Sequence, residues 1–82
     1  MKNQEIAKIF SNLAMYLSMD NVPFKPQAYE RAATAVESLS QDVEELYKTG
    51  GLKELEKIPG VGKGIAERIE EYLKIGKVKD YE

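Results

Sequence analysis

Residues 58–66 read Ile-Pro-Gly-Val-Gly-Lys-Gly-Ile-Ala and place three glycines within five positions, at Gly60, Gly62 and Gly64. Apolar residues recur at helical spacing on both sides of this stretch. The pattern predicts two helices joined by a tight glycine turn, together covering residues 52–75. A simpler interpretation is a helical corner whose glycines only turn the chain.

The turn also has a chemical consequence, because its backbone N–H groups would lie at the free end of the outgoing helix. The first four N–H groups of a helix have no acceptor within the helix, carry partial positive charge and favour an anion such as phosphate. Glycine lets a phosphate approach the backbone, whereas a side chain would hold it away. We therefore expect contacts to a nucleic-acid backbone, made without reading its sequence, at Gly60, Val61, Gly62, Lys63 and Gly64.

Composition limits the other possibilities. The chain has 82 residues, of which 43% are hydrophobic and 32% charged, as expected for one small domain. It contains no cysteine and no histidine, which excludes disulfides, thiolate chemistry, histidine bases and the commonest zinc ligands. The polar N-terminus and the lack of a long apolar run predict neither a signal peptide nor a membrane span, so we expect a cytoplasmic protein.

The net charge of −2 argues against a broad electrostatic DNA-binding surface, since proteins that neutralise many phosphates are usually basic. The charge is uneven, however. Residues 57–68 contain Lys57, Lys63 and Arg68 against Glu67 alone. This pattern favours a small local contact with phosphates.

Apolar periodicity predicts an all-α fold of four to five short helices around one core, forming a single domain over residues 1–82. Asn3 is a candidate N-cap for the first helix, Asp42 with Glu45 has the spacing of a capping box, and Gly76 suits the end of the last helix. Because the chain starts at Met1 and its end shows no stop signal, we expect an N-terminal piece of a longer protein. We also expect it to be a monomer. The expected helices cover about 4–19, 26–39, 42–49, 52–58 and 63 or 64–75.

Two sets of residues carry a resemblance to known families. Ile58, Gly60, Val61, Gly62, Ile65 and Ala66 match the pattern of the helix-hairpin-helix motif. Residues 24–33, 58–73 and 76–78 are similar to the N-terminal domain of family X DNA polymerases, which include polymerase beta and the PolX enzymes. The resemblance implies a domain that holds gapped or nicked DNA for repair. It also implies that the polymerase carboxylates and their Mg²⁺ ions would lie in a missing C-terminal part.

In well-studied members of that family this domain is also a lyase, whose lysine forms a Schiff base with an abasic sugar. Arg68 stands at the matching position, and a guanidinium cannot supply the neutral primary amine that a Schiff base needs. We therefore expect no catalytic residue in this chain.

The resemblance further implies a pocket for the 5′-phosphate of the downstream strand, formed by Lys25, Tyr29 and Arg68. Phe24 replaces a histidine of some members, Gly64 a second pocket lysine and Asp80 a backup lysine. The simpler interpretation makes Tyr29 a core aromatic and leaves the two cations in solvent.

The family also binds a potassium or sodium ion at the hairpin through three backbone carbonyls. The matching positions are Glu56, Ile58 and Val61. Such an ion would help to bridge the hairpin to a DNA phosphate.

Three functions remain open at the level of sequence. The first is sequence-independent binding of gapped or nicked DNA in a repair polymerase. The second is a 5′-deoxyribose-phosphate lyase that uses another amine, such as Lys63 or Lys25. The third is a protein-interaction domain with a vestigial hairpin, which the acidic balance favours.

Overall fold

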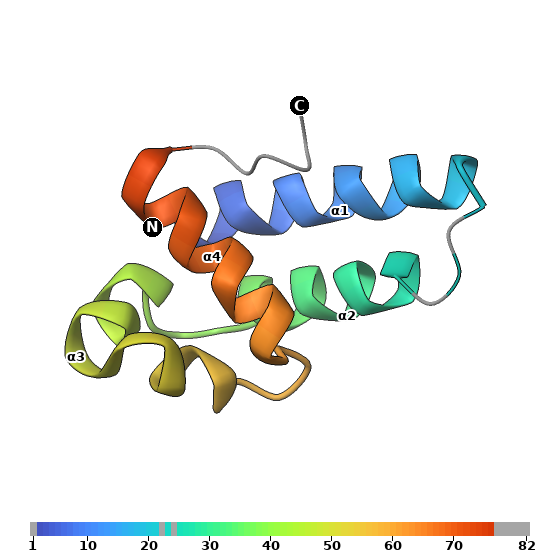
Figure 1. Cartoon of the computed structure of the whole chain (residues 1–82). Coiled ribbons are helices and arrows are strands. Elements are labelled where there is room, and N and C mark those ends of the chain that lie inside the picture. Colours follow the sequence, from blue (N-terminus) through green and yellow to red (C-terminus); the bar gives the residue numbers. More distant parts are fainter. Residues whose placement is uncertain (1, 22, 24, 77–82) are drawn as a thin grey trace.

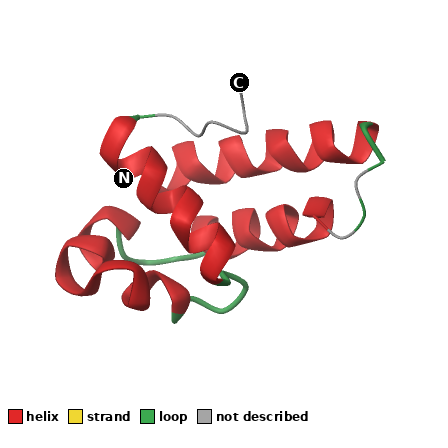
Figure 2. Ribbon diagram, viewed as in Figure 1, coloured by secondary structure: helices red, strands yellow, loops and turns green. Residues whose placement is uncertain are grey.

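The computed structural model describes residues 2–21, 23 and 25–76, and within this part all regular secondary structure is helical (Figure 1; Figure 2). The predicted all-α fold is therefore confirmed, with four helices joined by short loops. They are α1 (Asn3–Met19), α2 (Lys25–Glu37), α3 (Val43–Glu56) and α4 (Lys63–Ile75).

Helices α1 and α2 lie side by side and antiparallel, and α4 crosses them (Figure 1). The alanines of α2 allow its backbone to lie close to its neighbours, since Ala32 and Ala33 are both buried. All four helices contribute to one hydrophobic core, which joins Phe10 and Leu13 of α1 to Ile69 of α4. This arrangement holds the start of α4 next to α2.

The prediction of Asn3 as an N-cap is wrong. Lys2 occupies the N-cap position, and Asn3 lies inside α1 with only 1% of its surface exposed. Its amide nitrogen donates to the Gln41 carbonyl at 2.7 Å, and its amide oxygen accepts from the Val43 N–H at 2.8 Å. A buried amide needs such partners, and Asn3 finds them across the core at the start of α3 instead of in its own helix.

Helix α3 begins after Asp42 and is interrupted at Gly51, as the sequence predicts. Asp42 caps it, although the side chain accepts from the Glu44 N–H at 3.0 Å and not from the Glu45 N–H that the capping box requires. Gly51 adopts φ 67° and ψ −152°, which kinks α3 between its two helical halves. These halves correspond to the two short helices predicted on either side of Gly50.

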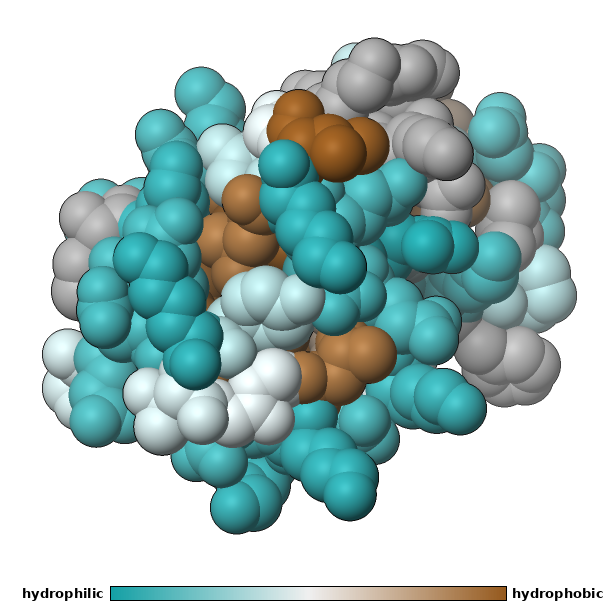
Figure 3. Space-filling model, turned by 60° about the vertical axis from the view of Figure 1, so that its left-hand side comes forward, coloured by the Kyte–Doolittle hydropathy of each residue, from teal (hydrophilic) through white to brown (hydrophobic). Residues whose placement is uncertain are grey.

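The last helix has the predicted bounds and the predicted end. Gly76 adopts the left-handed conformation at φ 78°, and its N–H donates to the Tyr72 carbonyl at 2.8 Å. Seen from the side of α3, the surface is mostly hydrophilic with a few small apolar areas (Figure 3). No helix among the described residues is both long and apolar enough to span a membrane.

Candidate nucleic-acid interface

The hairpin between α3 and α4 is a tight turn held by one short-range hydrogen bond. The Val61 N–H donates to the Ile58 carbonyl at 2.9 Å, with Pro59 and Gly60 between them. Gly60 has φ 94°, and proline followed by a glycine with positive φ is typical of a type II turn. Ile58 and Val61 are buried and anchor the turn in the core.

Gly60 also touches α2. A Cβ atom built on Gly60 would lie 3.4 Å from both the Ala35 Cβ atom and the Arg31 carbonyl oxygen. The positive φ favours glycine here, while the two Cβ distances correspond to ordinary van der Waals contact with α2.

Gly62 and Gly64 have neither a positive φ nor a close neighbour. Gly62 is the N-cap of α4 with φ −88°, a value open to any residue, and Gly64 lies in the first turn of α4. A Cβ atom on either glycine would meet nothing within 4 Å. The two glycines leave the backbone at the start of α4 open to an approaching group.

The backbone donors at this end of α4 follow from its first hydrogen bond. The Ala66 N–H donates to the Gly62 carbonyl at 2.8 Å, and Gly62 provides no side-chain cap. The N–H groups of Gly62, Lys63, Gly64 and Ile65 therefore precede the first bond of the helix and have no acceptor within it.

A groove of about 720 Å³ runs between the hairpin, the start of α4 and the start of α2. The structure brings the predicted hairpin contacts and the predicted 5′-phosphate pocket to this groove, with one exception. Among the described hairpin residues, Lys63 is exposed but is not part of the lining. The predicted residues that do line the groove are Gly60, Val61, Gly62, Gly64, Lys25, Tyr29 and Arg68.

The charged side chains of the groove wall are mostly cationic. Four positively charged side chains line it against the single carboxylate of Glu56, which gives the lining a net charge of +3. Two of them, Arg31 and Lys57, were not predicted as site residues. The positive charge of the segment 57–68 was a sequence signal for Lys57. Arg31 reaches the groove because α2 packs against the hairpin.

Tyr29 belongs to the core and to the groove at once. It is 6% exposed, and its ring packs edge-on against Phe10 with centroids 5.4 Å apart. The interpretation of Tyr29 as a core aromatic is thus confirmed, and the same residue forms part of the groove wall. The predictions that concern Phe24 and Asp80 lie outside the described residues.

The three predicted carbonyl ligands of a monovalent cation also belong to residues that line the groove, namely Glu56, Ile58 and Val61. The Ile58 carbonyl already accepts the Val61 N–H, which leaves it a second lone pair. Glu56 ends α3, where helix carbonyls lack internal partners and carry partial negative charge. Oxygen donors of this kind suit a hard monovalent cation, and the described residues contain no carboxylate cluster that would hold a divalent one.

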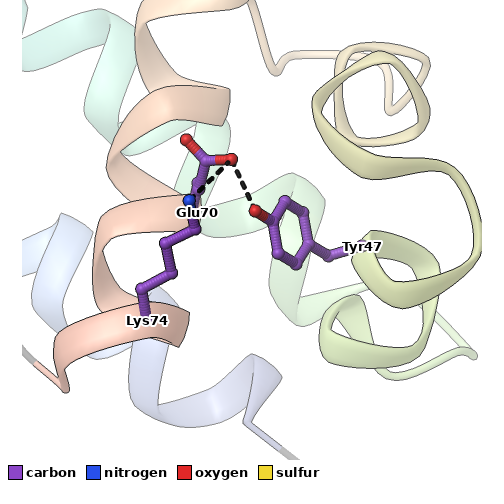
Figure 4. A network of polar contacts seen from close by, with 3 residues as sticks. All are labelled: Tyr47, Glu70 and Lys74. Atoms are coloured by element: carbon purple, nitrogen blue, oxygen red, sulfur yellow. Dashed lines mark hydrogen bonds and ion pairs between the residues drawn. The ribbon is translucent and has the colours of Figure 1, made fainter.

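The other end of α4 is bonded to its neighbours. The Tyr47 hydroxyl donates to the Glu70 carboxylate at 2.5 Å, and the same carboxylate lies 3.8 Å from the Lys74 ammonium (Figure 4). The hydrogen bond to Glu70, followed by desolvation, raises the pKa of Tyr47 above its usual value of 10.0. Burial and a hydrogen bond to Glu5 likewise raise the pKa of Tyr72.

Comparison with known proteins agrees with the architecture. The sequence model of the helix-hairpin-helix domain family matches residues 1–78. A comparison with curated proteins finds no match. Helix-hairpin-helix domains are generally nucleic-acid binding. Because the match covers nearly all of the 82 residues, this chain belongs to the helix-hairpin-helix domain family.

Proposed function

We propose that this domain binds gapped or nicked DNA independently of sequence, as the N-terminal domain of a family X repair polymerase. The observation that carries the proposal is the groove itself, which joins the free N–H groups of α4 to Lys25, Tyr29 and Arg68. Backbone donors and cations contact phosphates, and such contacts position DNA without specifying its sequence. A groove of this kind suits a backbone that ends in a 5′-phosphate.

The two parts of the groove have separate roles. The N–H groups of Gly62, Lys63 and Gly64 bind an internal phosphate of the DNA strand. Lys25 and Arg68 bind the 5′-phosphate at the gap, because the Arg68 guanidinium can make two parallel hydrogen bonds to it. Tyr29 forms the wall between these cations and the core.

A potassium or sodium ion would fit between the hairpin and the DNA. The carbonyls of Glu56, Ile58 and Val61 would hold it, and the ion would supply positive charge to the bound phosphate. The carbonyl chemistry of these positions, described above, supports this assignment. Replacing K⁺ by tetramethylammonium at constant ionic strength should weaken DNA binding.

A lyase activity is the second candidate, and the position of Lys25 in the groove favours it. An exposed primary amine beside a bound 5′-sugar phosphate could form a Schiff base. Borohydride trapping on incised abasic DNA tests this directly. A covalent adduct that forms with the wild type and is lost in Lys25→Ala or Lys63→Ala would favour a lyase over a domain that only binds DNA.

Fluorescence anisotropy on DNA with a one-nucleotide gap, with and without a 5′-phosphate, tests the proposed function. Each neutralised phosphate contributes about −0.9 to the slope of log affinity against log salt. We expect a slope of roughly −2 to −4 and tighter binding to the phosphorylated gap. Salt-dependent binding with equal affinity for both DNAs would contradict the proposed Lys25–Tyr29–Arg68 pocket. Absence of binding at low salt would favour a protein-interaction domain instead.

A further inference from the structure

A second hollow, of about 540 Å³, lies on the outer face of α2. Arg31 and Pro59 line both this hollow and the phosphate groove, so the two adjoin at these residues. The lining consists of Gln27, Glu30, Arg31, Thr34, Ala35 and Pro59.

The charge of the second hollow differs from that of the groove. Its one cation, Arg31, is balanced by the carboxylate of Glu30, whereas the groove has a net charge of +3. This zero net charge favours a neutral occupant of the second hollow over a phosphate.

The side chains define the chemistry of that occupant. The Gln27 amide and the Thr34 hydroxyl can each donate and accept hydrogen bonds, while Ala35 and Pro59 present apolar surface. Gln27, Arg31 and Thr34 follow one another at i, i+4 and i+7, which places them on one face of a rigid helix. Nucleobases combine an apolar face with donors and acceptors at the edge, and single-stranded bases present both.

We propose that the second hollow receives an unpaired nucleobase of the same DNA whose phosphates occupy the groove. The inference rests on the proposed binding of gapped DNA, which supplies unpaired template bases next to the 5′-phosphate. Amide and hydroxyl groups adapt to any base, so this site is tolerant of sequence.

An abasic scan tests the proposal, because it removes one base at a time and keeps every phosphate. The substrate is DNA with a five-nucleotide gap, carrying a tetrahydrofuran residue at successive template positions. Because hydrogen bonds to one base are lost, the wild-type domain should lose affinity about tenfold at one position and little at the others. The double variant Gln27→Ala/Thr34→Ala should bind all these substrates equally, at the affinity of the wild type for the weakest one.

Gln4→Ala is the matched control, since Gln4 is exposed on α1 and should retain the position dependence. Arg31 is left intact because it also lines the phosphate groove. Circular dichroism confirms that each variant is folded. If the wild-type protein binds gapped DNA with the same affinity at every abasic position, the nucleobase site is overturned and the proposed function stands. A loss of affinity at one abasic position that persists in the double variant would also overturn the nucleobase site. Absence of binding to any gapped DNA would overturn both the nucleobase site and the proposed function.

Discussion

The two ends of α4 are built from different kinds of residue and make different contacts. At the N-terminal end, Gly62 and Gly64 leave backbone donors open beside a cationic groove. At the C-terminal end, Glu70 is bonded to Tyr47 and Tyr72 is bonded to Glu5. One end thus offers unsatisfied groups to a ligand, while the other fastens the helix to α3 and α1. Substitutions at the first end should alter DNA binding, and substitutions at the second should alter stability.

Gly62→Asp should give the largest effect and separates binding from stability. Aspartate is a better N-cap than glycine, so the free energy of unfolding should not fall. Its carboxylate would occupy the position of the bound phosphate, and we expect at least about a tenfold loss of DNA affinity, or roughly 1.4 kcal/mol. Anisotropy and urea denaturation measure the two quantities. Gly62→Val should also weaken binding with native circular dichroism, and unchanged affinity in both variants would mean that the hairpin is not the contact.

Gly76→Ala tests the opposite end of the same helix. Gly76 has a positive φ, which costs an alanine about 1 kcal/mol, while a Cβ atom there meets nothing within 4 Å. The urea midpoint should fall and DNA affinity should stay as in the wild type. A loss of affinity at this position would contradict the division between the two ends.

Tyr47→Phe removes one hydroxyl from the cluster of Tyr47, Glu70 and Lys74 (Figure 4). The Glu70 carboxylate then loses this hydrogen bond and keeps its partly exposed ion pair with Lys74, so the melting temperature should fall slightly. DNA affinity should not change. Lys74→Gln serves as the control, because exposed ion pairs contribute little to stability.

The smallest effect concerns pH. Tyr47 and Tyr72 have pKa values raised above 10.0, so their neutral forms stabilise the folded state fully below pH 10. This stability is lost as the pH rises through the raised values. The urea midpoint should therefore decline above pH 10, and less steeply in Tyr47→Phe/Tyr72→Phe. An equal decline in that variant would mean that these hydroxyls do not couple to folding.

Features encoded by neighbouring residues were predictable from the sequence. Pro59 before Gly60 indicates the turn, Gly76 indicates the end of α4, and Gly50 with Gly51 indicates the break in α3. The backbone conformations that glycine permits explain why these predictions are confirmed.

Features that depend on distant residues were not predictable in the same way. Asn3 has the local pattern of a cap, but its partner Val43 lies 40 positions away. Arg31 becomes part of the groove because the hairpin packs against α2. Tertiary packing decides both, and periodicity along one segment carries no information about it.

The most direct test of the central claim is an amide NMR titration of the domain with DNA carrying a one-nucleotide gap and a 5′-phosphate. The account predicts that the largest shifts occur at the N–H groups of Gly62, Lys63, Gly64 and Ile65, with smaller ones at Lys25. Residues at the C-terminal end of α4, such as Glu70 and Lys74, should not respond. Shifts confined to that end, or spread over α1, would show that the open start of α4 is not where the phosphate binds.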